Sequence, residues 1–268
     1  MMKVSVSMIT YNHENYIAQA IEAVLMQKTN FEVELVISND NSTDNTHEII
    51  KDVIATNNTN IKIKYFNNLE NKGMMPNFIH NLEHCDGNYI ALCDGDDYWT
   101  DPLKLQKQID LLESNLNIAI CYHQVNSDYN GSITDYTSDK ESITSIKDLA
   151  KENYIVNCSV VYRNGLINEL PNYFISSPIG DYFLHLLNAR KGDIFYIKEK
   201  MANYRIHDSS YWSTKNSLER AEILNRFITN IKPHFNQEIQ DILQIQLEKL
   251  PRRKTTFFKK ISNFLSRK

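Results

Sequence analysis

Short apolar segments alternate with amphipathic segments along the first half of this chain. The apolar or alternating segments have the length of strands and lie at residues 3–9, 33–38, 61–66, 89–93 and 118–122. Between them, apolar residues recur at helical spacing, at residues 14–27, 42–55, 76–84 and 102–115. Strands that alternate with helices in this way predict an α/β fold with a central, mostly parallel sheet and helices on its faces.

Polar clusters follow four of the predicted strands, where each strand ends. They lie at residues 10–12, 39–41, 67–72 and 94–97. The carboxyl ends of parallel strands meet at one edge of an open sheet, where ligands bind, so we expect the four clusters to come together. Asn and Asp also favour turns after strands. This alternative explains residues 39–41 well but explains the acids of residues 94–97 poorly.

Three carboxylates, Asp94, Asp96 and Asp97, lie directly after the predicted buried strand 89–93. Uncompensated negative charge beside an apolar core is costly, and a divalent cation would offset it. Mg²⁺ and Mn²⁺ bind one or two carboxylates and then phosphate oxygens. The spacing therefore predicts a metal site that holds a phosphorylated ligand.

The composition is that of a soluble globular protein, with 42% hydrophobic and 23% charged residues among 268. Apolar runs are shorter than the roughly 18 residues that span a bilayer, and the first residues have a strand pattern that is not typical of a secretory signal. The four cysteines have no CxxC spacing. We therefore expect reduced thiols and a cytoplasmic location.

The net charge of −4 hides an uneven distribution. Residues 252–268 hold seven bases and no acid, whereas the rest of the chain holds 22 bases and 33 acids. An acidic body is a poor partner for nucleic acid. The tail interleaves bases with apolar residues at helical spacing, which favours an amphipathic helix on the cytoplasmic face of an anionic membrane. A helix packed on the parent domain, or a frayed basic end, fits the pattern equally well.

Seven motifs follow one another over residues 3–213. They are residues 4–12, 36–44, 71–73 with Asn77, 87–90, 94–99, 180–182 and 204–207. In this order the chain resembles the family 2 glycosyltransferases, which implies the GT-A fold, a Rossmann-like α/β fold, and transfer of a sugar with inversion. One position departs from the family's pattern, because the Asp-Asp pair often found after the second strand is Asn39-Asp40 here.

The resemblance implies nucleotide binding by nine residues: Thr10, Tyr11, Asn12, Asp40, Asn71, Gly73, Asn77, Asp94 and Arg205. Asp40 would accept the N3–H of uracil or thymine, although it could also only cap the following helix. Asp94 would face the ribose or a bound water, and Arg205 would clamp the diphosphate. Gly95 would let a ligand come close or give the turn an unusual backbone angle.

The resemblance also assigns Asp96 and His207 as ligands of a divalent cation, Mn²⁺ or Mg²⁺. Asp97 would support these ligands from behind or cap the next helix. Trp212 would stack on a sugar or close over the product. The other seven histidines receive no metal role, and His13 would at most line the base pocket.

The resemblance also implies that Asp181 is the general base. A carboxylate in a closed sugar site has a raised pKa and accepts a proton well, which is compatible with this role. The place of Asp181 at the start of a predicted helix also suits a mere cap. We expect a nucleotide-sugar donor, a UDP-sugar, and hexosyl or N-acetylhexosaminyl transfer to a glycan or lipid-linked acceptor of a surface polysaccharide. A degenerate nucleotide-sugar binding protein is the alternative, and it would be expected to lack Asp96, Asp181 or His207.

The predicted domain organisation has a catalytic domain at residues 1–213, in which 1–100 bind the nucleotide and 101–213 bind the acceptor. A helical extension follows at residues 214–250, and then a basic amphipathic tail at 251–268. Residues 128–142 are polar and predict a loop beside the acceptor or a partly disordered excursion. The extension is expected to form two helices separated near Pro233, which pack on the catalytic domain or form a dimer interface.

Overall fold

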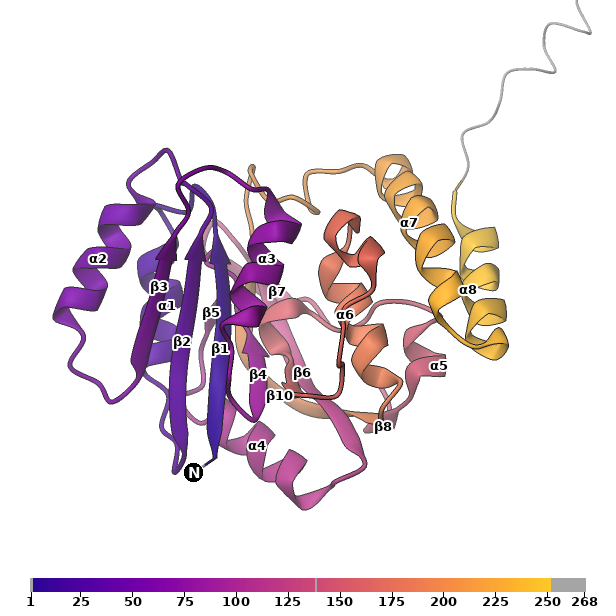
Figure 1. The fold of residues 1–268 in the computed structure, drawn as a ribbon, viewed down its shortest axis with the longest axis horizontal. Coiled ribbons are helices and arrows are strands. Elements are labelled where there is room, and N and C mark those ends of the chain that lie inside the picture. Colours follow the sequence, from indigo (N-terminus) through magenta and orange to yellow (C-terminus); the bar gives the residue numbers. More distant parts are fainter. Residues whose placement is uncertain (1, 138, 252–268) are drawn as a thin grey trace, which may run out of the picture.

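The computed structural model describes residues 2–137 and 139–251. The predicted membrane-binding segment, residues 252–268, lies outside this part of the chain. Among the described residues, one ten-stranded sheet runs through the molecule in the order β3-β2-β1-β4-β9-β6-β10-β5, with β7 paired to β6 and β8 paired to β10 (Figure 1). Both predicted halves, 1–100 and 101–213, contribute strands to this sheet.

The first four strands along the chain are parallel, as predicted. They are β1 (Lys3–Thr10), β2 (Glu32–Asn39), β3 (Lys62–Asn67) and β4 (Tyr89–Leu92). Their register pairs Thr10 with Asn39, and Asn39 with Asn67, so the carboxyl ends of β1, β2 and β3 meet at one edge. This edge is at the top of Figure 1. The predicted gathering of polar strand ends is therefore confirmed.

The second half of the sheet is mixed rather than parallel. β6 (Ile118–Tyr129) and β10 (Asp193–Ile206) are parallel to each other. β9 (Val161–Arg163) lies antiparallel between β4 and β6, and β5 (Tyr98–Trp99) and β8 (Ile143–Thr144) pair antiparallel with β10. The α/β fold is confirmed, and parallel pairing holds for the first four strands and for β6 with β10.

Residues 128–142 were expected to form a loop, and the structure corrects this in part. β6 continues through Tyr129 and turns back into β7 (Ser132–Asp135). The two residues of the turn, Asn130 and Gly131, both have positive φ, at 51° and 85°. Asn-Gly is the pair favoured in such two-residue hairpins, because both residues tolerate this backbone conformation.

Helices cover both faces of the sheet. On one face, α1 (Ile17–Leu25), α2 (Thr46–Thr56) and α4 (Lys104–Ser114) share a core with inward-facing residues of β1 and β6. On the other face, α3 (Met74–Glu83) and α6 (Gly180–Ala189) share a second core with β4 and the opposite side of β6. Figure 1 shows α3 in front of the sheet beside β1, with α1 behind β2 and β3.

Two buried asparagines fix α3 on the sheet. Asn81 donates from Nδ2 to the carbonyl oxygens of Met8 and Val36. Asn77 donates to the carbonyl of Ser38 and accepts from the Ser38 hydroxyl and from Asn68. Because both ends of the Asn77 amide are used in this way, the structure gives Asn77 a structural role behind the site rather than the predicted contact with the nucleotide.

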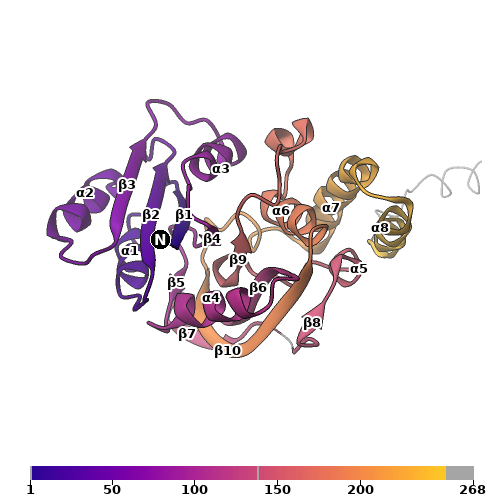
Figure 2. The ribbon, with the colours of Figure 1, turned by 60° about the horizontal axis from the view of Figure 1, so that its bottom comes forward.

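The extension at residues 214–250 forms two helices, as expected. α7 (Ser217–Ile231) and α8 (Gln237–Lys249) are separated by a short 3₁₀ turn, η3 (Lys232–His234), which contains Pro233. Phe227 of α7 packs on Tyr182 of α6, with ring centroids 5.3 Å apart. Figure 2 shows both helices at the end of the molecule opposite α2 and β3. Within the described residues, every helix falls short of the length and apolarity needed to cross a bilayer.

Candidate active site

A short strand pairing assembles the acidic end of the site. β5 pairs with β10 in a register that sets Trp99 opposite Ala202 and Tyr98 opposite Asn203. The segment that precedes β5, residues 94–97, is the acidic turn. It therefore lies beside the residues that end β10. This pairing brings Asp96 and Asp97 next to Arg205 and His207, more than 100 residues further along the chain.

Asp96 and His207, the two predicted metal ligands, contact each other directly. Nε2 of His207 lies 3.1 Å from Oδ2 of Asp96, and Nδ1 of His207 lies 2.8 Å from the Ser209 hydroxyl. When Nδ1 carries the proton and donates to Ser209, the lone pair of Nε2 faces Asp96. Burial acts to raise the pKa of Asp96, but the neighbouring His13 and His207 outweigh burial and lower it.

The two flanking acids are held in the same turn. Asp97 is buried and accepts a hydrogen bond from the backbone N–H of Arg205, at 2.8 Å. Asp94 accepts from Nδ2 of Asn157 at 2.6 Å. Burial and then the charge of Asp96 raise the pKa of Asp94 to about 8, and the same causes raise the pKa of Asp97. Burial and the neighbouring carboxylates thus disfavour the charged forms of Asp94 and Asp97, and a bound dication would offset this cost.

This arrangement fits a divalent cation bound partly by its substrate. Among the described residues, no three His, Cys, Asp or Glu side chains are placed to hold a metal. Asp96 and His207 supply one oxygen and one nitrogen on a shared side. Mg²⁺ and Mn²⁺ sites of this kind are completed by phosphate oxygens and water. The residues present therefore fit a metal that is shared with a diphosphate.

Gly95 allows the acidic turn to pack on the end of β1. A Cβ at Gly95 would lie 2.7 Å from the Thr10 hydroxyl and 2.8 Å from Thr10 Cβ. The glycine N–H donates to the carbonyl of Ile9 at 2.9 Å. The need for glycine is therefore close approach to Thr10, and not the unusual backbone angle that the sequence suggested, because Gly95 is not among the glycines with positive φ.

The structure gives Arg205 a different role from the predicted diphosphate clamp. Its guanidinium is enclosed between the rings of Tyr16 and Tyr98, whose centroids lie 4.8 and 4.7 Å away. It donates to the carbonyl of Asp96 at 2.7 Å and to the side chain of Gln19. Arg205 is buried, so we assign it to holding the acidic turn in place.

Arg205→Lys tests this assignment. A lysine cannot stack between two rings and bridge two acceptors at once, so we expect the free energy of unfolding to fall by about 2 kcal/mol. Urea denaturation measures this, with Arg226→Lys on the exposed side of α7 as a control that should change little. A clamp that acts only on a diphosphate would instead leave stability unchanged and weaken only donor binding.

The predicted base-binding residues line the same edge of the sheet. Asn12 has a positive φ of 55° and accepts from the N–H of Thr43, which joins the ends of β1 and β2. The Asp40 carboxylate accepts from the N–H of Lys72 at 2.8 Å, from the N–H of Gly73 at 2.9 Å and from Asn68. Asp40 thus shapes the 68–73 loop.

Asn71 and Tyr11 complete this edge. Asn71 donates to the carbonyl of Asp40 and accepts from the N–H of Gly73, so it supports the same loop. Gly73 has a φ of 86°, which its backbone tolerates without strain. Tyr11 is exposed and free to contact a ligand. Contact of these residues with a nucleotide base stays a prediction.

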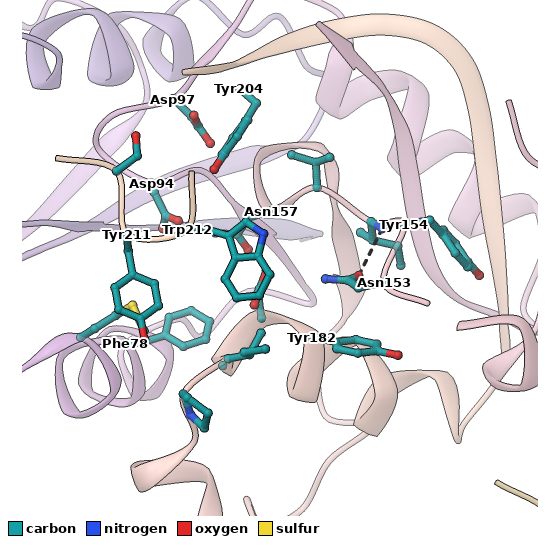
Figure 3. Close-up of a pocket in the computed structure, with 18 of the residues that line it drawn as sticks. Phe78, Asp94, Asp97, Asn153, Tyr154, Asn157, Tyr182, Tyr204, Tyr211 and Trp212 are labelled. Atoms are coloured by element: carbon teal, nitrogen blue, oxygen red, sulfur yellow. Dashed lines mark hydrogen bonds between the residues drawn. The ribbon is translucent and has the colours of Figure 1, made fainter. Parts of the chain in front are cut away.

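A cavity of about 640 Å³ opens beside the acidic turn. Asp94, Asp96, Asp97 and Asp181 all line it, together with Trp212. In Figure 3, Asp94 and Asp97 lie at one side and Trp212 lies over the centre. This volume is typical of small-molecule sites, which have about 300–1,000 Å³.

Asp181 lies in the first turn of α6 and faces this cavity. It is partly buried, and burial raises the pKa of its carboxyl. The preceding residue, Gly180, packs against the Met75 side chain of α3: a Cβ there would lie 2.4 Å from the sulfur. α3 and α6 therefore fix the place of Asp181 opposite the acidic turn.

The sequence analysis missed Asn157. It begins the 3₁₀ turn η1 (Asn157–Ser159), holds Asp94 through Nδ2, and lines the cavity. Its Oδ1 is buried and has no hydrogen-bond partner among the described residues. A buried carbonyl without a donor is well placed to accept a ligand hydroxyl. No local sequence pattern around residue 157 signals this, because the contact with Asp94 spans 63 residues.

Comparison with protein families places these observations in context. Residues 5–171 match the family model described as glycosyl transferase family 2. An uncharacterized protein of Mycobacterium tuberculosis is 36% identical over 214 residues, which cover 78% of this chain and 60% of that protein. The chain thus spans about three fifths of the length of that relative.

A second relative matches over most of both chains. The Escherichia coli UDP-Glc:alpha-D-GlcNAc-diphosphoundecaprenol beta-1,3-glucosyltransferase WfgD is 31% identical over 232 residues, which cover 85% of this chain and 87% of WfgD. Among solved structures, Staphylococcus aureus TarS in complex with UDP-GlcNAc superposes with a TM-score of 0.68 at 18% identity, over 92% of this chain and 72% of TarS.

A further structure shares the fold. The mannosyltransferase PcManGT from Pyrobaculum calidifontis, in complex with GDP-Man and Mn²⁺, superposes with a TM-score of 0.65 at 14% identity, over 91% of this chain and 68% of that chain. At such low identity these superpositions establish the fold: the sheet and helices described above have the arrangement of GT-A glycosyltransferases.

Proposed function

This chain belongs to glycosyl transferase family 2, and from that premise we propose that it transfers a sugar from a nucleotide-sugar donor to a hydroxyl group of a saccharide acceptor, with inversion. The observation that carries the proposal is the shared cavity. Asp181 faces it from α6, while the acidic turn and Trp212 line the same space. A base and a site for a diphosphate therefore lie around one volume that accommodates a sugar.

Asp181 is the group that we assign to proton transfer. Its carboxylate would accept the proton of the acceptor hydroxyl while that oxygen attacks the anomeric carbon from the face opposite the leaving group. Burial raises its pKa, which makes the carboxylate a stronger base than an exposed one. Direct displacement of this kind inverts the anomeric configuration.

Asp96 and His207 would hold the cation, Mn²⁺ or Mg²⁺. When bound, the ion supplies positive charge that stabilises the departing nucleoside diphosphate. Ser209 fixes the ring of His207, and Arg205 fixes the backbone of Asp96. Both metal-binding side chains are therefore oriented before the cation or the donor binds. The alternative, a degenerate binding protein, is disfavoured because Asp96, Asp181 and His207 are all present and close to one cavity.

The donor that we propose is a UDP-sugar, and the acceptor is a lipid-linked saccharide used for a surface polysaccharide. WfgD, which is similar over nearly its whole length, is named for transfer from UDP-Glc to a diphosphoundecaprenol-linked sugar. A second relative, the putative glycosyltransferase EpsE of Bacillus subtilis, is 40% identical over 118 residues, which cover 44% of this chain. The basic tail would then hold the enzyme at the cytoplasmic face of the membrane that carries the acceptor.

A panel of nucleotide sugars, measured by thermal unfolding with and without Mn²⁺, tests this proposal. One UDP-sugar is expected to raise the melting temperature by roughly 5–10 °C at 100 times its Kd, because it binds only the folded state. The rise should vanish with EDTA. If no nucleotide sugar stabilises the folded protein in the presence of Mn²⁺, the proposed donor chemistry is overturned.

A further inference from the structure

The cavity extends well beyond the reaction centre. Besides the acidic turn, Asn157 and Trp212, its lining includes Leu224 of α7 and Gln246 of α8 at a far end. In Figure 3, Asn153, Tyr154 and Tyr182 lie on the side opposite Asp94 and Asp97. A single sugar at Asp181 would leave this part of the cavity unfilled.

Amide groups at the far end have unused hydrogen-bonding capacity. Tyr182 lies 2.7 Å from the carbonyl of Leu149 and 3.4 Å from Oε1 of Gln246. A phenol has one proton to donate, and the shorter contact takes it. Oε1 of Gln246 thus lacks a strong donor, and its Nε2 has no partner within the described part of the chain. Asn153 accepts a 3.3 Å bond from Ile155, and its Nδ2 is likewise without a described partner.

The charged residues at the far end do not favour the binding of a phosphate group. Lys140 is the basic residue that lines the cavity. It forms an ion pair with Glu152, and its ammonium lies 5.1 Å from the ring centroid of Tyr154. An ion pair carries no net charge, so this end offers no excess positive charge to a diphosphate. The half-buried ring of Tyr154 beside neutral amides instead suits a sugar, which presents C–H groups on one face and hydroxyls at its rim.

We propose that the far end, formed by Asn153, Tyr154 and Gln246 over the buried Tyr182, is a binding subsite for a second sugar of the acceptor. The enzyme thus prefers acceptors with at least two sugar units over the corresponding monosaccharide. Gln246 belongs to the helical extension, so the extension takes part in reading the acceptor. This inference rests on the proposed transferase function and adds to it the minimum length of the acceptor.

The test compares monosaccharide and disaccharide binding to the full chain saturated with UDP and Mn²⁺. The probes are methyl glycosides of glucose, galactose and N-acetylglucosamine, and disaccharides that end in each of them. Calorimetry or ligand-observed NMR gives the affinity ratio of each disaccharide to its monosaccharide. We expect a ratio of at least about tenfold for one pair, which is the effect of one or two well-made hydrogen bonds.

Two variants assign that ratio to the far end. Gln246→Leu and Asn153→Ala should each reduce the ratio at least about fivefold while leaving UDP binding and monosaccharide binding unchanged. Gln244→Leu, on the same helix but bonded to Lys232 outside the cavity, is the matched control and should keep the ratio. Asn153 lies on an exposed segment, so its substitution tests the subsite even if the α8 variant fails to fold.

The possible failures are distinguishable. If no disaccharide binds more tightly than its monosaccharide, or if both variants keep the wild-type ratio, the subsite is overturned while the transferase function stands. If UDP with Mn²⁺ does not bind the folded protein at all, the proposed function itself fails.

Discussion

Asp181→Asn is expected to lower kcat at least about 1,000-fold while leaving the affinity for the nucleotide sugar unchanged. Asparagine has the size of aspartate but cannot accept a proton at neutral pH. Asp181 lies in the first turn of α6 and faces the cavity, so the substitution removes the proposed base without disturbing the sheet edge where we propose that the donor binds. Initial rates measure kcat, and calorimetric titration of the nucleotide sugar in the presence of Mn²⁺ and without acceptor measures the affinity.

The pH dependence of kcat gives a second readout of the same role. Burial raises the pKa of Asp181, so its carboxyl is protonated, and unable to act as a base, over a wider acidic range than an exposed aspartate. The wild-type rate should therefore fall as pH decreases through this raised pKa, and the residual rate of the Asn variant should lack that dependence. Asp208→Asn, an exposed acid near the same cavity, is the control and should keep the wild-type profile. A fully active Asp181→Asn enzyme would remove Asp181 as the base.

The edge of the sheet at which the polar strand ends meet could be predicted, because it depends on the local pattern of strands and helices along the sequence. Parallel strands place their carboxyl ends at one edge whatever their exact lengths. Thr10, Asn39 and Asn67 are therefore aligned by register alone. The Asn130-Gly131 turn also carried a hairpin signal, yet the polar composition around it favoured a loop. Local sequence patterns thus predict the polar edge of the sheet correctly. The Asn130-Gly131 pair could also have predicted the β6–β7 hairpin, for which we expected a loop.

Other parts of the site depend on contacts between distant segments. The two-residue strand β5 is too short to be seen as a strand, but its pairing with β10 decides which residues face Asp96. Arg205 has the charge of a diphosphate clamp, and only the rings of Tyr16 and Tyr98 reveal that it is enclosed. Burial and long-range pairing therefore determine residue roles that residue type alone does not.

Asp96→Asn is expected to weaken Mn²⁺-dependent binding of UDP at least about 100-fold, since even residues that only orient a metal ligand contribute 10- to 100-fold. The amide that replaces the carboxylate carries no charge, so it attracts a dication far less. It also ends the close contact of that carboxylate with Nε2 of His207, now at 3.1 Å. Calorimetric titration of UDP in the presence and absence of Mn²⁺ measures the change.

Asp86→Asn provides the matched control, because Asp86 is an exposed acid that pairs with Lys3 and Lys64 and should not affect UDP binding. Unchanged Mn²⁺-dependent affinity in Asp96→Asn would place the cation elsewhere.

Together, the Asp181 and Asp96 variants separate donor binding from proton transfer in the cavity. The Asp181 variant should bind the donor and fail to turn it over, whereas the Asp96 variant should lose the donor first, because in the proposed mechanism the acidic turn holds the diphosphate through the cation and α6 supplies the proton acceptor.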